Sequence, residues 1–268
     1  MRVVVVSHHE LDSAGFIGEA FRARGAELSV HLFPKEGALP DLDGVDHVVV
    51  LGAVWAVYDD SPDRAWIADE LAWLRRADAA GVPVLGICFG AQALTAAFGG
   101  RVEAAPRKEV GWKMIETFDP ALIPPGPWLE FHGDRCFPPP QAEVIARNEV
   151  GVQAFVIGRH LGVQFHPEPD GEQLRLWLND GGREEAERAG TDPDEFLART
   201  FAEEPAARER ADTLVASALL LATGPSWLLS GRLLSGRLFA RGPARARCPA
   251  VGAPGRTDEF SSRPRRTG

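Results

Sequence analysis

The stretch that decides the fold is "PVLGICFGAQALTAAFGG", residues 83–100. Its first five residues, Pro83–Ile87, form a short apolar run that predicts a buried strand. The following run, Phe89–Phe98, predicts a helix that ends at Gly99-Gly100, because glycine commonly terminates helices. Cys88 lies at the junction between the two elements, flanked by Gly86 and Gly90. A strand that turns directly into a helix is typical of α/β proteins, so the flanking sequence is expected to repeat this unit.

The alternation of strand and helix does extend through the first hundred residues. Helices are predicted at residues 16–24 and from Ser61 to Gly81, with Ser61 as the N-cap and Pro62 in the first turn. Buried strands are predicted at residues 2–7, 27–33 and 46–51. This order predicts right-handed crossovers and a doubly wound, mainly parallel sheet of the flavodoxin-like, three-layer kind.

The second half of the chain has a different pattern. Short extended runs separated by proline and glycine predict hairpins, and therefore an antiparallel extension of the sheet. These runs are "VGWKMIETF", "WLEFH", "EVIARN", "GVQAFVI" and "HLGVQF". Helices are expected again at residues 170–179, around 193–203, and at 205–222.

Composition limits the class of protein and its location. No apolar stretch approaches the roughly 20 residues that span a bilayer, and the N-terminus does not resemble a secretory signal. Three scattered cysteines are too few for a disulfide framework, which favours a reducing cytoplasm. We therefore expect a cytoplasmic protein with no membrane span.

Charge divides the chain into two parts. Residues 223–268 contain nine arginines against Asp258 and Glu259, a formal charge of +7. Because the net charge of the whole chain is −9, the first 222 residues carry a charge of −16. An acidic body argues against nucleic-acid binding. The Gly/Pro/Arg-rich segment 223–268 is predicted to be a disordered tail beyond a domain at 1–222, or a short basic segment that binds an anionic surface.

The sequence around Cys88 has the form G-x-C-x-G, the cysteine version of the nucleophile elbow. The N-terminus of the following helix favours a thiolate on Cys88, and the backbone N–H of Phe89 would donate to a developing oxyanion. Gln92 lies one turn later among apolar neighbours, and its amide would find partners in a bound substrate. The motif alone is equally compatible with a structural cysteine in a glycine-rich turn.

A candidate base follows in "GVQFHPE", residues 162–168. Side chains two residues apart in extended backbone face the same side, so His166 and Glu168 are expected to lie together. A carboxylate beside an imidazole selects its tautomer and stabilises the imidazolium, which in turn activates a thiol. Cys88, His166 and Glu168 are therefore predicted to form a catalytic triad.

The chain resembles the class I, or triad-type, glutamine amidotransferases. Their hallmark G-x-C-x-G-x-Q corresponds to Gly86–Gln92, and their downstream H-P-E corresponds to residues 166–168. Looser similarities are "LGAVWAVYDD" after the third strand, "EVGW" at 109–112 and "FHGD" at 131–134. The resemblance covers about residues 1–222 and is closest to free-standing members that look like the glutaminase domain of GMP synthase.

The resemblance implies a reaction and a set of residues. Glutamine would be hydrolysed through a γ-glutamyl thioester on Cys88, with no cofactor or metal, and the ammonia would pass to a separate synthetase. Gln92 would help to hold glutamine. His132 of "FHGD" would line the pocket or be a satisfied loop histidine, and Trp112 would wall the pocket or only pack.

The resemblance also places a second oxyanion donor in the loop after the third strand. The family usually has Gly-Gly-Pro there, whereas this chain has Gly52-Ala53-Val54. If the native backbone needs a positive φ at Ala53, that residue would be strained and the oxyanion hole weak.

Three other functions remain open from the sequence. A γ-glutamyl hydrolase would use the same thioester chemistry on γ-glutamyl amines or peptides and would need no partner. A non-catalytic regulatory module would keep the triad without turnover, and the departure at Ala53 leaves room for it. A thiol stress protein on a similar fold is disfavoured by the H-P-E tripeptide.

Overall fold

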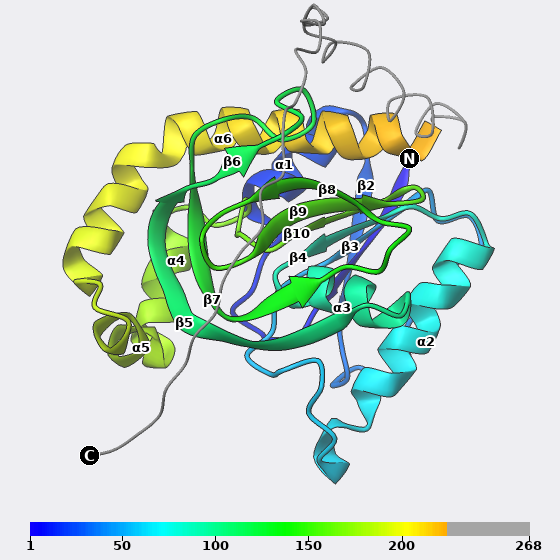
Figure 1. The fold of residues 1–268 in the computed structure, drawn as a ribbon. Coiled ribbons are helices and arrows are strands. Elements are labelled where there is room, and N and C mark those ends of the chain that lie inside the picture. Colours follow the sequence, from blue (N-terminus) through cyan, green and yellow to red (C-terminus); the bar gives the residue numbers. More distant parts are fainter. Residues whose placement is uncertain (224–268) are drawn as a thin grey trace, which may run out of the picture. The chain divides into compact units, whose positions relative to one another are not determined.

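The computed structural model describes residues 1–223, which form one sheet of ten strands with helices on both faces (Figure 1). The basic segment predicted to be a tail lies outside the described residues, apart from Thr223. The division of the chain at residue 222 therefore stays a prediction.

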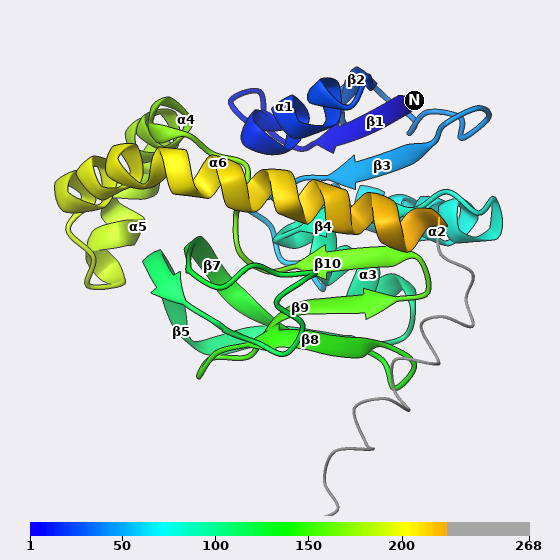
Figure 2. The same ribbon diagram turned by 90° about the horizontal axis from the view of Figure 1, so that it is seen from above.

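The sheet combines a parallel part and an antiparallel part. The strand order is β2-β1-β3-β4-β10-β9-β7-β5, with β6 and β8 beside this path, and most of it can be followed in Figure 2. Neighbours from β2 to β10 are parallel, and all later pairs are antiparallel. The strands are β1 (Arg2–Ser7), β2 (Glu27–Leu32), β3 (His47–Val50), β4 (Val84–Ile87), β5 (Arg101–Met114), β6 (Glu116–Thr117), β7 (Pro127–Phe137), β8 (Glu143–Arg147), β9 (Val152–Ile157) and β10 (His160–Val163). The predicted fold class is confirmed.

Helices cover both faces of the parallel part, so the molecule has three layers. Successive side chains of a strand face opposite sides. Val3 and Val5 of β1 belong to the core under α1 and α6, whereas Val4 and Val6 belong to the core under α2 and α3. The helices are α1 (Gly15–Ala23), α2 (Trp66–Ala79), α3 (Phe89–Ala97), α4 (Gly171–Trp177), α5 (Arg183–Arg188) and α6 (Pro193–Thr223), with short irregular turns η1 (Pro62–Arg64) and η2 (Leu178–Gly182).

Two helix predictions need correction, and one helix was missed. Ser61 does not cap α2, because its hydroxyl donates to Asp59 Oδ1 (2.6 Å) and a single 3₁₀ turn precedes the helix. The two helices expected on either side of Pro205 are one helix, α6, since buried side chains on both sides of the proline outweigh the hydrogen bond it cannot make. Helix α5 was not predicted from the sequence at all.

The carboxyl ends of the parallel strands meet at one edge of the sheet, where ligand sites of such folds lie. His8 directly follows β1, Gly52 lies two residues after β3, and Cys88 follows β4. The segment Gln164–His166 follows β10 at the same edge. Residues from four strand ends are thus brought together. In the described part of the chain, no helix is both long and apolar enough to cross a membrane.

Candidate active site

Cys88 occupies a sharp turn between β4 and α3. Its backbone has φ 51° and ψ −106°, and within residues 1–223 it is the only non-glycine residue with a positive φ. Such a conformation costs about 1–3 kcal/mol and persists only where the surroundings impose it. The neighbouring strand does so, because the Cys88 N–H donates to the Val163 carbonyl (2.8 Å). The predicted nucleophile elbow is therefore present, with the cysteine at the N-terminus of α3.

The two glycines of the elbow are required by close backbone contacts. A Cβ on Gly86 would lie 2.5 Å from the Gly90 carbonyl oxygen, and a Cβ on Gly90 would lie 2.3 Å from the Val50 carbonyl oxygen. Real Cβ atoms do not approach backbone oxygens this closely, so either added Cβ would displace the backbone of α3, β3 or β4. The spacing G-x-C-x-G is thus a packing requirement of the turn.

Gly90→Ala is therefore expected to destabilise the protein by about 2 kcal/mol or more, as overpacked cores do. Urea denaturation would measure the free energy of unfolding. Gly133→Ala is the matched control, because the atoms nearest its added Cβ belong to the flexible Lys108 side chain. Equal stability of the two variants would contradict this account of the elbow.

His166 and Glu168 lie together and are held by distant segments. His166 Nδ1 is 2.7 Å from Glu168 Oε1, and both side chains are buried. The backbone N–H of His166 donates to the Leu129 carbonyl of β7, and the backbone carbonyl of Glu168 accepts from the N–H of Phe16 in α1 (2.9 Å). Backbone hydrogen bonds to β7 and α1 thus hold the segment that carries the pair.

The imidazole of His166 also faces Cys88. A Cβ added at Gly52 would lie 3.0 Å from His166 Cε1 and 3.7 Å from Cys88 Cβ, so the three residues meet at one point. Burial alone would lower the pKa of His166, but the charges of Glu168 and the Cys88 sulfur raise it well above its usual 6.5. The geometry favours an imidazolium beside the sulfur.

A pocket of about 210 Å³ opens over these groups. Cys88, His166 and Glu168 line it together with the loop residues Gly52, Ala53 and Val54. Aromatic walls come from Phe131 and Trp177, and the rim carries the polar residues His9, Asp12, Asp180 and Glu185. The pocket is smaller than the roughly 300–1,000 Å³ of sites for drug-sized ligands, so its size suits a small substrate.

The loop after β3 does not have the strain that Ala53 would introduce in a left-handed backbone. Among residues 1–223 no alanine has a positive φ. The Gly52 carbonyl accepts a hydrogen bond from the buried His8 (3.0 Å). Within the same residues, no protein acceptor takes the backbone N–H of Ala53 or of Phe89. Both predicted oxyanion donors are thus free to bind a ligand.

The three residues predicted to bind substrate do not line this pocket. Gln92 is buried beside Gln164, with Nε2 and Oε1 3.5 Å apart. Trp112 lies in the core and donates its indole N–H to Thr200 Oγ1 (2.8 Å). Its polar atom is already satisfied away from the pocket, as expected of a packing residue. His132 lies behind Cys88 in a buried network.

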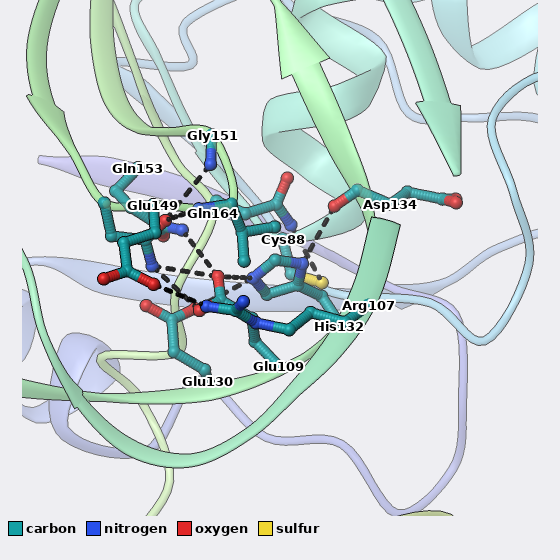
Figure 3. Close-up of polar contacts among 12 residues, drawn as sticks. Cys88, Arg107, Glu109, Glu130, His132, Asp134, Glu149, Gly151, Gln153 and Gln164 are labelled. Carbon is teal, nitrogen blue, oxygen red and sulfur yellow. Dashed lines mark hydrogen bonds and ion pairs between the residues drawn. The ribbon is translucent and has the colours of Figure 1, made fainter. Parts of the chain in front are cut away.

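Figure 3 shows this network, which centres on the His132 ring. Nδ1 lies 2.8 Å from the Asp134 carbonyl, and Nε2 lies 3.1 Å from Glu130 and 3.3 Å from Glu109. Burial would lower the pKa of His132, but its contacts with Glu109 and Glu130 raise it to about 10. The sequence did not predict that three potential metal ligands lie within 4.8 Å of one another here. A proton on the ring already balances part of the carboxylate charge.

Two further contacts to the triad were missed in the sequence. Gln164 Nε2 points to the Cys88 sulfur (3.7 Å), and Gln164 Oε1 faces the thiol of Cys136 (3.5 Å). Gln164 lies in a bend that follows β10, so its contact with Cys88 depends on the tertiary structure. Trp177 packs edge-on against His166 with ring centroids 5.1 Å apart, and no local pattern indicates that contact.

Comparison with known proteins agrees with this geometry. The family described as glutamine amidotransferase class-I matches residues 15–176, more than half of the chain. The glutamine-hydrolysing GMP synthase of Bartonella bacilliformis is 29% identical over 173 residues, covering 58% of this chain and 32% of that protein. That of Thermomicrobium roseum is 34% identical over 164 residues, covering 56% and 28%. The chain thus matches about a third or less of the length of these relatives.

Solved structures show the same fold. A glutamine amidotransferase from Thermotoga maritima superimposes with a TM-score of 0.74 at 24% identity, covering 83% of this chain and 98% of that one. One from Methylobacillus flagellatus also has a TM-score of 0.74 at 24% identity, covering 82% and 94%. At this identity the structural likeness speaks for the fold alone. The family match over residues 15–176 shows that the chain belongs to the class I glutamine amidotransferases.

Proposed function

We propose that this chain hydrolyses the side-chain amide of glutamine through a thioester on Cys88, and releases glutamate and ammonia. The observation that carries the proposal is the meeting of Cys88, the buried His166–Glu168 pair and the loop residue Ala53 in one small pocket. The free N–H of Ala53 lies in that loop, and the free N–H of Phe89 belongs to the residue that follows Cys88 in the chain. Nucleophile, base and oxyanion donors are the complete set that acyl transfer needs.

The first half-reaction forms the thioester. The Cys88 sulfur attacks the amide carbon, and the resulting oxyanion accepts hydrogen bonds from the N–H groups of Ala53 and Phe89. The His166 imidazolium then gives its proton to the amide nitrogen, and the C–N bond breaks to release ammonia. Glu168 keeps the ring oriented through its 2.7 Å contact with Nδ1.

The second half-reaction releases glutamate. His166, now neutral, takes a proton from water, and the water oxygen attacks the thioester carbon. The same two N–H groups stabilise the second oxyanion. When the C–S bond breaks, Cys88 leaves as the thiolate and His166 is again an imidazolium, so the site returns to its starting state.

We propose a separate synthetase as the ammonia acceptor. The relatives are named as glutamine-hydrolysing GMP synthases, and this chain matches only about a third of their length. These relatives support a synthetase as the partner that takes up the ammonia.

The test is the release of glutamate and ammonia by the purified chain, with glutamine and γ-glutamylmethylamide compared as substrates. We expect glutamate and ammonia in equal amounts from glutamine, and a kcat/KM for glutamine at least about tenfold higher than for the methylamide. A preference for the methylamide would instead favour a γ-glutamyl hydrolase. Glutamine binding without release of either product would favour the regulatory module.

A further inference from the structure

A buried histidine–carboxylate pair lies behind the loop that carries the Ala53 N–H. His8 follows β1, Glu70 lies in α2, and both side chains are completely buried. His8 Nε2 is 3.0 and 3.2 Å from the two Glu70 oxygens, and His8 Nδ1 is 3.0 Å from the Gly52 carbonyl oxygen. Neither residue has a part in the reaction described above.

The contacts define the protonation of this ring. A carbonyl and a carboxylate are both acceptors, so both ring nitrogens of His8 donate and the ring is an imidazolium. Burial would lower the pKa of His8, but Glu70 and the Gly52 carbonyl raise it above the usual 6.5. The ring cannot turn easily, because Phe89 packs against it edge-on (4.9 Å) and Trp66 lies 5.6 Å away.

The Gly52 carbonyl and the Ala53 N–H belong to the same peptide group. A trans peptide is planar, so its C=O and N–H point in opposite directions, and the Gly52–Ala53 bond is trans. A donor that holds the carbonyl toward His8 therefore holds the N–H on the opposite side. Gly52, Ala53 and Cys88 line the pocket together, whereas His8 does not line it.

We propose that His8 and Glu70 are positioning residues for the oxyanion hole, and that they hold the Gly52–Ala53 peptide with its N–H directed toward the Cys88 side of the loop. This inference rests on the proposed glutaminase function. A charged donor on the carbonyl also polarises the peptide and strengthens the N–H as a donor. His8 holds the peptide from the side of the loop away from Cys88. The loop Gly52-Ala53-Val54 can therefore supply an oxyanion donor without a left-handed backbone at Ala53.

The test replaces the pair by apolar residues in the double variant His8→Leu/Glu70→Met, which avoids leaving a buried carboxylate unpaired. The oxyanion contact is made in the transition state, so we expect kcat for glutamine to fall about 10- to 100-fold and KM to change less than about threefold. The variant His8→Asn/Glu70→Met returns an N–H donor near the position of Nδ1. It should recover about half or more of the lost activation free energy.

Alkylation of Cys88 by iodoacetamide separates positioning from general damage. That reaction forms no oxyanion, so its rate in the apolar double variant should stay within about twofold of wild type. The variant should also unfold in a cooperative thermal transition. An unchanged kcat, or equal losses in alkylation and in turnover, would overturn the proposal. Wild-type protein that is alkylated but releases no glutamate would overturn the proposed function instead.

Discussion

Cys88→Ser is expected to lower glutamate release from glutamine by about 10⁴-fold or more. A serine hydroxyl is far less acidic than a thiol, so the His166 imidazolium has no anionic nucleophile beside it. Losses of this size are typical when a triad nucleophile is removed. The measurement is the rate of glutamate formation at saturating glutamine, after a thermal melt has shown that the variant is folded.

Cys136→Ser is the matched control for this variant. Cys136 is also buried and lies on the other side of Gln164, but it does not line the pocket. A serine there keeps a donor to Gln164 Oε1, so turnover should stay within about threefold of wild type. A Cys88→Ser protein that turns over glutamine at the wild-type rate would rule out the thioester mechanism.

Glu168→Gln is expected to lower kcat/KM about 10³-fold while the protein stays folded. The amide keeps the shape of the side chain but no longer selects the tautomer of His166 or stabilises its charged form. Burial works against the charge on His166, and the carboxylate of Glu168 is the first group that raises its pKa above 6.5. Removing that carboxylate should therefore also change the pH dependence.

The direction of the pH effect follows from the raised pKa. In the wild type the raised pKa keeps the His166 imidazolium charged as pH rises from 6.5 to the folded pKa, and the charge is lost above it. In Glu168→Gln the alkaline limb of kcat/KM should move to lower pH. Glu172→Gln, the same change on the exposed face of α4, should leave the profile in place. Overlapping profiles for Glu168→Gln and wild type would mean that Glu168 does not tune His166.

The sequence anticipated most of the fold, because the elements are encoded by neighbouring residues. The predicted strand at residues 2–7 agrees with β1 to the residue, and the turn at Cys88 has the backbone that its glycines indicated. The helix after Ser61 began later than expected, since the local alternative, a hydrogen bond from Ser61 to Asp59, competed with the cap. Errors of this kind arise where two local interactions of similar strength are available.

The candidate site residues were likewise predicted best where neighbouring residues encode them. Cys88, His166 and Glu168 lie in short motifs whose spacing states their geometry, and the structure brings the three together at one pocket. Trp112 kept two interpretations in the sequence, because an aromatic side chain in a strand can face a core or a pocket equally well, and the structure places it in the core. Gln164 was missed because its contact with Cys88 joins residues far apart in the chain.

By itself, the sequence determined the alternation of strand and helix, the glycine-flanked turn and the pairing of His166 with Glu168, since each depends on residues within one element or one turn. Only the tertiary structure decided which distant groups share a surface. His8 meets Gly52 across 44 residues and Glu70 across 62, and Gln164 meets Cys88 across 76. Those contacts depend on which strands become neighbours at the carboxyl edge of the sheet. That order is set by burial summed over the whole core, which no local pattern records.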